Sequence, residues 1–94
     1  MSREGKLTKQ IDEGNQAESL IKNPIFEKVF NSLEQEFLTA WKSSSVEDSA
    51  EREKLYYLFQ ALQALKTGIL NVSANGRLAK SQLDEMVGRS KTIN

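Results

Sequence analysis

The sequence predicts an all-α fold: an antiparallel helical hairpin of two long amphipathic helices, with a flexible N-terminal leader and a short C-terminal helix. Three observations predict it. Apolar residues recur every three or four positions in two stretches, a serine-rich loop separates those stretches, and Asn-Pro and Asn-Gly pairs mark helix ends. A chain of 94 residues holds one small core and leaves much of its apolar surface uncovered, so we also expect it to be oligomeric.

The leader is predicted to span residues 1–15. It contains two glycines and alternating charges, and its only large apolar residues are Leu7 and Ile11. So few apolar side chains do not offset the entropy lost when a segment becomes ordered. The helical hairpin domain then covers residues 16–88, and residues 89–94 form a basic tail.

The first long helix is predicted to begin at Asn23-Pro24. An Asn side chain at the N-cap accepts hydrogen bonds from free amides of the first turn, and Pro at the first helical position sacrifices no hydrogen bond. Lys42 and the three serines after it end the helix. Its apolar stripe follows steps of four and three and consists of Phe26, Phe30, Leu33, Phe37 and Ala40 or Trp41.

The second long helix is predicted to begin between Val46 and Ser49, with Ser45 and Asp48, or Asp48 and Glu51, as a capping-box-like start. Asn75-Gly76 would close it, because glycine adopts the left-handed C′ conformation without strain. A third, short helix would then follow and end at Gly88. Six apolar residues occupy heptad a and d positions and predict the buried seam: Leu55, Leu58, Leu62, Leu65, Ile69 and Val72.

The composition excludes several kinds of chemistry. The chain has no histidine and no cysteine, which removes zinc enzymes, thiol enzymes and disulfides. Two carboxylate pairs remain, Glu34 with Glu36 and Asp84 with Glu85, and neither pair converges on a helix, so we interpret both as solvated surface features. We therefore predict a non-enzymatic protein with no catalytic residue, no cofactor and no metal.

Charge and hydropathy argue against two classes of partner. Thirteen basic residues balance thirteen acidic ones, which argues against nucleic acid as a partner. No stretch approaches the ~18 apolar residues that a membrane helix needs, and we expect no membrane association. A basic segment after Gly76 is a candidate contact for an acidic protein or nucleic acid, although a solvated tail is the more ordinary interpretation. It contains Arg77, Lys80, Arg89 and Lys91.

A second face of the second helix is the strongest candidate for protein binding. Its mostly small residues would let another helix approach closely, and Gly68 inside a helix costs about 1 kcal/mol relative to alanine, which packing could offset. Lys66 is the only charged residue between Leu55 and Gly76. The alternative is that another segment of the same chain covers this face. The candidate interface residues are Trp41, Tyr56, Tyr57, Ala61, Ala64, Gly68 and Asn71. For Trp41, the more ordinary role is to close the end of the hairpin core.

Several of these elements together resemble a family of small tailed-bacteriophage proteins encoded near portal, capsid or packaging genes. The resemblance covers residues 20–86, and it implies no functional residue. It implies a phage product in the host cytoplasm or the virion: a minor virion component or assembly factor that binds itself, a phage structural protein, or both. The alternative is an accessory regulator that binds a host protein or a small ligand. The resemblance rests on Asn23-Pro24, Phe30, Leu33-Glu34-Gln35-Glu36, Trp41, Arg52-Glu53, the leucine run, Asn75-Gly76-Arg77-Leu78-Ala79 and Leu83.

Overall fold

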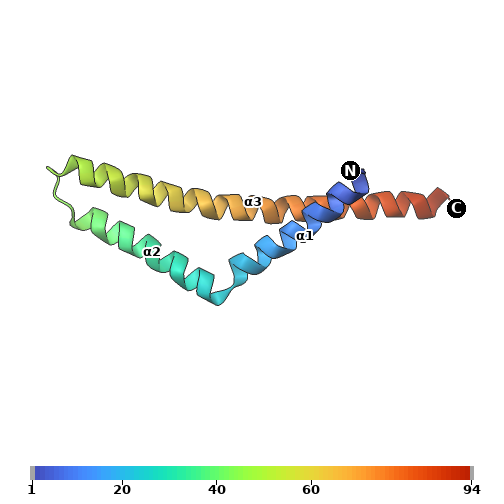
Figure 1. The fold of residues 1–94 in the computed structure, drawn as a ribbon, viewed down its shortest axis with the longest axis horizontal. Helices are drawn as coiled ribbons and strands as arrows, with labels where there is room; N and C mark the ends of the chain where they lie inside the picture. The colour runs from blue at the N-terminus through green and yellow to red at the C-terminus, as the bar shows by residue number, and fades with distance from the viewer. Residues whose placement is uncertain (1, 94) are drawn as a thin grey trace. The chain divides into compact units, whose positions relative to one another are not determined.

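The computed structural model describes residues 2–93, with side chains described as far as Arg89, and these residues form three α-helices (Figure 1). They are α1 (Arg3–Lys22), α2 (Pro24–Ser43) and α3 (Ser49–Ile93). The all-α prediction is confirmed. The chain divides into two units: the hairpin unit, Lys22–Gly68, holds α2 and the first part of α3, and the α1 unit holds α1 and the part of α3 from Ile69 onward.

The start of α2 is the one the sequence predicts. Asn23 has extended backbone angles, and its side-chain oxygen accepts hydrogen bonds from the backbone N–H of Ile25 (2.9 Å) and Phe26 (3.2 Å). Pro24 occupies the first helical position. A cap of this kind contributes about 1 kcal/mol to stability. The break between α1 and α2 is therefore encoded locally.

A short loop turns the chain from α2 into α3. The backbone N–H of Glu51 donates to Oδ1 of Asp48 (3.4 Å), so Asp48 caps α3, which begins at Ser49 inside the predicted range. Across the hairpin unit, Arg52 reaches Ser44 while Gln63 reaches Glu34. The later residue of α3 thus meets the earlier residue of α2, and the predicted antiparallel hairpin is confirmed within this unit.

Half of the predicted seam is wrong. Leu55 is buried and Leu62 is half-buried as expected, but Leu58 and Leu65 are 39 % and 54 % exposed, and Val72 is exposed as well. Phe59 is half-buried instead, and its helical spacing from Leu55 and Leu62 fits the buried side of α3. A repeat of seven fits two seams that share Leu55 and Leu62. The position of α2 selects between them.

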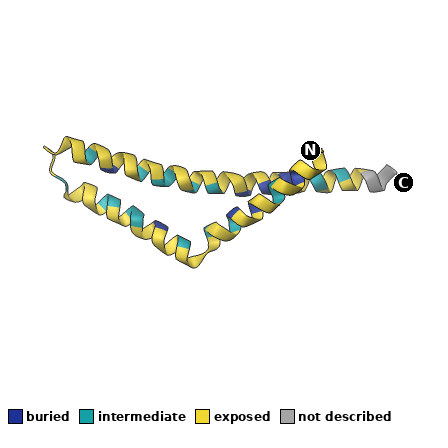
Figure 2. Ribbon diagram, viewed as in Figure 1, coloured by how far each residue is buried: buried dark blue, intermediate teal, exposed yellow. Residues whose placement is uncertain are grey.

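The predicted flexible leader is also wrong, because residues 3–22 form α1. The buried residues of α1 are Leu7, Gly14 and Ala17, and those of the opposing part of α3 are Ser73, Gly76 and Ala79 (Figure 2). Most of these side chains are small or absent. They stabilise the pair by letting two backbones approach closely, which a count of large apolar residues does not detect.

Gly76 lies at this crossing and does not end a helix. A Cβ added to Gly76 would lie 2.7 Å from Cα of Gly14, and one added to Gly14 would lie 2.6 Å from Cα of Gly76. In the described part of the chain no glycine has a positive φ. The predicted short third helix is therefore the continuation of α3.

The predicted helix end at Gly88 and the predicted separate basic tail of residues 89–94 are both wrong. α3 continues through Gly88 to Ile93, and the Arg89 guanidinium forms an ion pair with Glu85 one turn earlier (2.6 Å). The side chains of residues 90–94, Lys91 included, lie outside the described residues. Among the residues described, no helix is both long and apolar enough to cross a membrane.

Candidate interaction surfaces

Few large side chains are buried in either unit. Among the described residues, the buried hydrophobic ones are Leu7, Ala17, Phe30, Leu55 and Ala79, and no large side chain is fully buried. Thirteen large hydrophobic residues in the described part of the chain are exposed, so the candidate sites are apolar surfaces (Figure 2). The described residues contain no cluster of acidic side chains that could hold a metal ion.

An apolar recess of about 220 Å³ lies near the loop end of the hairpin unit. Its walls come from both helices, and its polar side-chain groups are the amide of Gln60, the hydroxyl of Tyr56 and the indole N–H of Trp41. The lining residues are Phe37, Leu38 and Trp41 of α2 and Leu55, Tyr56, Phe59 and Gln60 of α3. A recess of this composition can take one apolar side chain from another protein.

Trp41, one wall of this recess, is held from the other helix by Arg52. The guanidinium carbon of Arg52 lies 4.5 Å from the centre of the indole ring, a cation–π contact. Nη1 of Arg52 also donates to Oγ of Ser44 (2.9 Å) and to its carbonyl oxygen (3.4 Å). Trp41 is nevertheless 41 % exposed. The sequence pattern does not indicate this role of Arg52, because its partners come from a different helix and loop.

Glu34 is not the solvated surface carboxylate that the sequence predicts. Nε2 of Gln63 donates to Oε2 of Glu34 across the two helices at 2.6 Å, and Glu34 is half-buried. Glu36, Asp84 and Glu85 are exposed, as a solvated surface requires. Glu34 therefore fixes the register of the hairpin, since a charged acceptor makes the stronger kind of hydrogen bond.

One flank of the hairpin unit carries exposed apolar residues from both helices. Nζ of Lys66 lies 5.1 Å from the centre of the Phe30 ring, so these two positions face each other. Val29 and Leu65 each come one residue earlier. In a pair of antiparallel helices, the residues that come one position before two facing residues point to the same side of the pair. Val29 and Leu65 therefore share a flank.

This flank, called the Val29–Leu65 flank below, extends along both helices. Ile25 lies one turn before Val29 and is 68 % exposed, and Leu58 lies two turns before Leu65. Ala61, one turn before Leu65, is exposed at the edge of the same flank, and Gly68 lies further round on the outer side of α3. A Cβ added to Gly68 would meet no atom within 4 Å. The space beside Gly68 is open.

The seven candidate interface residues are all exposed, but they do not form one surface. Trp41 and Tyr56 line the recess, and Ala61 lies at the edge of the Val29–Leu65 flank. Helical spacing puts Tyr57, Ala64 and Gly68 on the outer side of α3. There the Tyr57 hydroxyl donates to Oε1 of Glu53 (3.2 Å). Asn71 belongs to the α1 unit.

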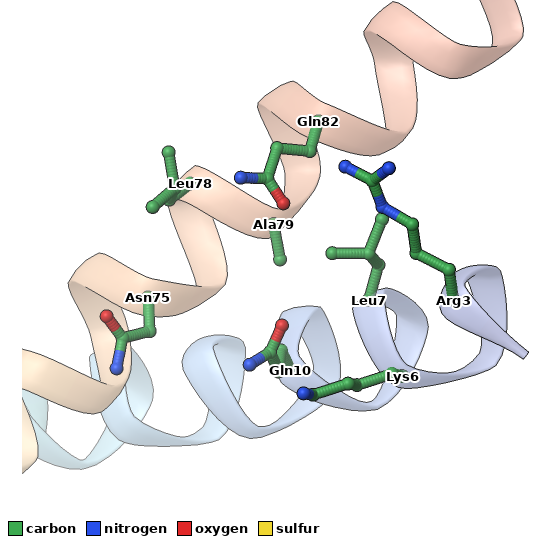
Figure 3. A pocket seen from close by; sticks show the side chains of 8 residues that line it. All are labelled: Arg3, Lys6, Leu7, Gln10, Asn75, Leu78, Ala79 and Gln82. Carbon is green, nitrogen blue, oxygen red and sulfur yellow. The ribbon is translucent and has the colours of Figure 1, made fainter. Parts of the chain in front are cut away.

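A second recess, of about 300 Å³, lies between the helices of the α1 unit (Figure 3). Leu7 and Ala79 lie between the two helices there, and Arg3, Lys6 and Gln82 are among the longer polar side chains around them (Figure 3). Polar and apolar atoms line this recess in similar amounts, and it is open to solvent.

The basic candidates of the α1 unit lie on α3. Nη1 of Arg77 donates to Oγ of the buried Ser73 (3.0 Å), and Arg89 pairs with Glu85. Lys80 is exposed, and the Lys91 side chain is outside the described residues. Two of the four charges are thus engaged within their own helix.

Comparisons with protein-family models, with curated proteins and with solved structures each found no match.

Proposed function

We propose that this chain is a non-enzymatic interaction protein, which binds an apolar side chain of a protein partner in the recess beside Trp41. The observation that supports this most directly is the recess itself: seven residues of α2 and α3 enclose about 220 Å³ with an almost entirely apolar lining. Trp and Tyr are enriched among the residues that dominate binding energy at interfaces, and the recess contains one of each.

The rigidity of Trp41 adds to the argument. Arg52 holds the indole from one side while 41 % of the residue stays exposed, so little side-chain entropy is lost when a partner binds. A partner with an apolar anchor on a helix or an extended segment fits such a site. We place this partner among tailed-phage structural proteins on the resemblance described above, which makes the chain a minor virion component or an assembly factor.

Quantitative mass spectrometry of purified phage particles and of infected-cell lysate tests this proposal. We expect a constant copy number in particles or in assembly intermediates. Trp41→Ala should lower incorporation at least tenfold, because hot-spot truncation costs about 2 kcal/mol or more. Thr39→Ala, at an exposed position of the same helix, is the matched control and should be incorporated normally.

Absence from particles and from every assembly intermediate would overturn the structural role. An accessory regulator that binds a host protein or a small ligand would then be the better proposal. The basic segment supports that alternative less well, because Arg77 and Arg89 already interact with Ser73 and Glu85.

A further inference from the structure

We infer that α1 is a releasable arm, which detaches from α3 and loses its helical structure while the hairpin unit stays folded. The attachment of α1 to α3 differs from that of α2 in the size of the buried side chains and in the polar contacts between the helices. Both differences make α1 the more weakly attached helix. The hydrogen bonds at the boundary between α1 and α2 then allow α1 to leave alone.

The side chains that α1 buries are few and mostly small. Its buried residues are Leu7, Gly14 and Ala17, whereas α2 buries the ring of Phe30. The large apolar side chains that are buried or half-buried are Leu7, Ile11 and Ile21 in α1, and Phe26, Phe30, Leu33, Phe37 and Leu38 in α2. The hydrophobic gain grows with the apolar area removed from water, so α1 gains less from its contact than α2 does.

The polar contacts also distinguish the two helices. In the hairpin unit, the Gln63 side chain donates to Glu34 across the helices, and Arg52 donates to Ser44. Along residues 3–17 of α1, the side-chain hydrogen bonds and ion pairs all stay within that helix. They join Thr8 to the carbonyl of Glu4, Gln16 to Asp12, and Lys9 to Glu13. Release of this part of α1 therefore breaks no polar side-chain contact with α3.

The start of α2 does not depend on α1. The backbone N–H groups of Ile25 and Phe26 donate to the Asn23 side chain, and that of Glu27 donates to the Asn23 carbonyl (3.0 Å). Pro24 has no N–H to donate. The first turn of α2 thus takes its acceptors from Asn23 and none from α1, so α2 keeps these hydrogen bonds when α1 leaves.

Release changes what both helices of the α1 unit present to solvent. Helices in proteins take most of their stability from tertiary packing, and Gly14 is a poor helix former in the interior of α1. Once it has left α3, α1 therefore unwinds and its amides exchange with water. The strip of α3 that α1 covered becomes accessible at Ser73, Gly76 and Ala79, which are buried in the closed form.

The recess beside Trp41 stays outside the released part, because all seven of its lining residues belong to the hairpin unit. The inference is thus independent of the proposed function. Partner binding at the recess and release of α1 can each be disproved without the other.

Hydrogen exchange of the full chain at low urea concentrations, followed at single amides by NMR, tests this inference. We expect amides of residues 9–20 in α1 to exchange at least tenfold faster than those of residues 29–40 in α2. Their opening should also depend less on urea, because release exposes less surface than unfolding of the whole chain. Equal rates with equal urea dependence in the two helices would overturn the inference.

Two substitutions that each add one methyl group to α3 form a matched pair. A Cβ at Gly76 would lie 2.7 Å from Cα of Gly14, whereas one at Gly68 would meet no atom within 4 Å. Gly76→Ala should speed the exchange of α1 at least tenfold, up to complete loss of its protection, and leave that of α2 unchanged. Gly68→Ala should speed neither. If Gly76→Ala speeds exchange in α1 and α2 alike, the two helices unfold together and α1 is no separate arm.

Discussion

The two units of this molecule use one helix, α3, in two different ways. In the hairpin unit, large side chains such as Phe30 and Leu55 are buried and polar clamps link the helices. In the α1 unit, Gly14 and Gly76 bring two backbones into contact. Packing of large side chains can be recognised in the sequence as a hydrophobic pattern. The close approach at Gly14 and Gly76 can be recognised only when the two glycines are known to face each other.

We expect the largest loss of stability when a large core side chain of the hairpin unit is removed. Phe30 is 5 % exposed and stacks against Phe26 with ring centres 6.0 Å apart. We expect Phe30→Ala to lower the free energy of unfolding by about 3 kcal/mol. Hydrogen exchange should show the greatest loss of protection in α2. Thr39→Ala, at an exposed site of α2, should change stability by less than about 0.5 kcal/mol, and equal effects would contradict this core.

A single methyl group added at the helix crossing should destabilise the α1 unit. At Gly76 the new Cβ would lie 2.7 Å from backbone of α1, which cannot rotate away as a side chain can. After the gain in helix propensity, we expect Gly76→Ala to cost about 2 kcal/mol, with loss of amide protection in α1. Gly68→Ala, where space is open, should instead add about 1 kcal/mol. If both variants are stabilised alike in thermal unfolding, the close crossing is wrong.

Removal of the α2 cap should have a smaller effect. Asn23→Ala leaves the amides of Ile25 and Phe26 without their side-chain acceptor, and we expect a loss of about 1 kcal/mol in denaturant unfolding. Asn31→Ala replaces an exposed asparagine inside the same helix and should be neutral or slightly stabilising. An Asn23 variant as stable as the Asn31 variant would show that the boundary is set by tertiary packing.

The exchange of Arg52 for lysine should have the smallest effect on stability and a clear spectroscopic one. Lysine keeps the charge but loses the planar group that stacks on Trp41 and also reaches Ser44. We expect Arg52→Lys to cost about 0.5 kcal/mol. The chain has one tryptophan, so its fluorescence emission should shift to longer wavelength. Lys54→Arg, at an exposed site, should leave the emission unchanged.

The features that sequence analysis predicts correctly have a local cause. The Asn23 cap, the Asp48 start and the antiparallel hairpin each depend on residues close together in the chain. Tyr56 and Tyr57, two of the candidate interface residues, are exposed. Such features need no knowledge of the partner helix.

The errors have a common physical reason, which is that the partner helix decides the outcome. The pair Asn75-Gly76 is typical of a helix end. Gly76 is instead a crossing point, because Gly14 of α1 lies against it. The heptad pattern fits two seams, and the position of α2 selects the one with Phe59. The candidate interface residues are spread over different sides of α3 for the same reason: helical spacing alone does not show which side α2 covers.

The Gly14–Gly76 crossing also has a consequence for the order of folding. Contacts between residues near in sequence form quickly, while distant ones wait for the loss of loop entropy. The hairpin closes through a short loop, but α1 must find a strip of α3 that the ribosome makes after all of α2. During synthesis α1 emerges before α2 and α3. The residues of α3 that α1 contacts are made only after α2 is complete. A nascent chain arrested before Gly76 should therefore hold α1 in a form open to other proteins.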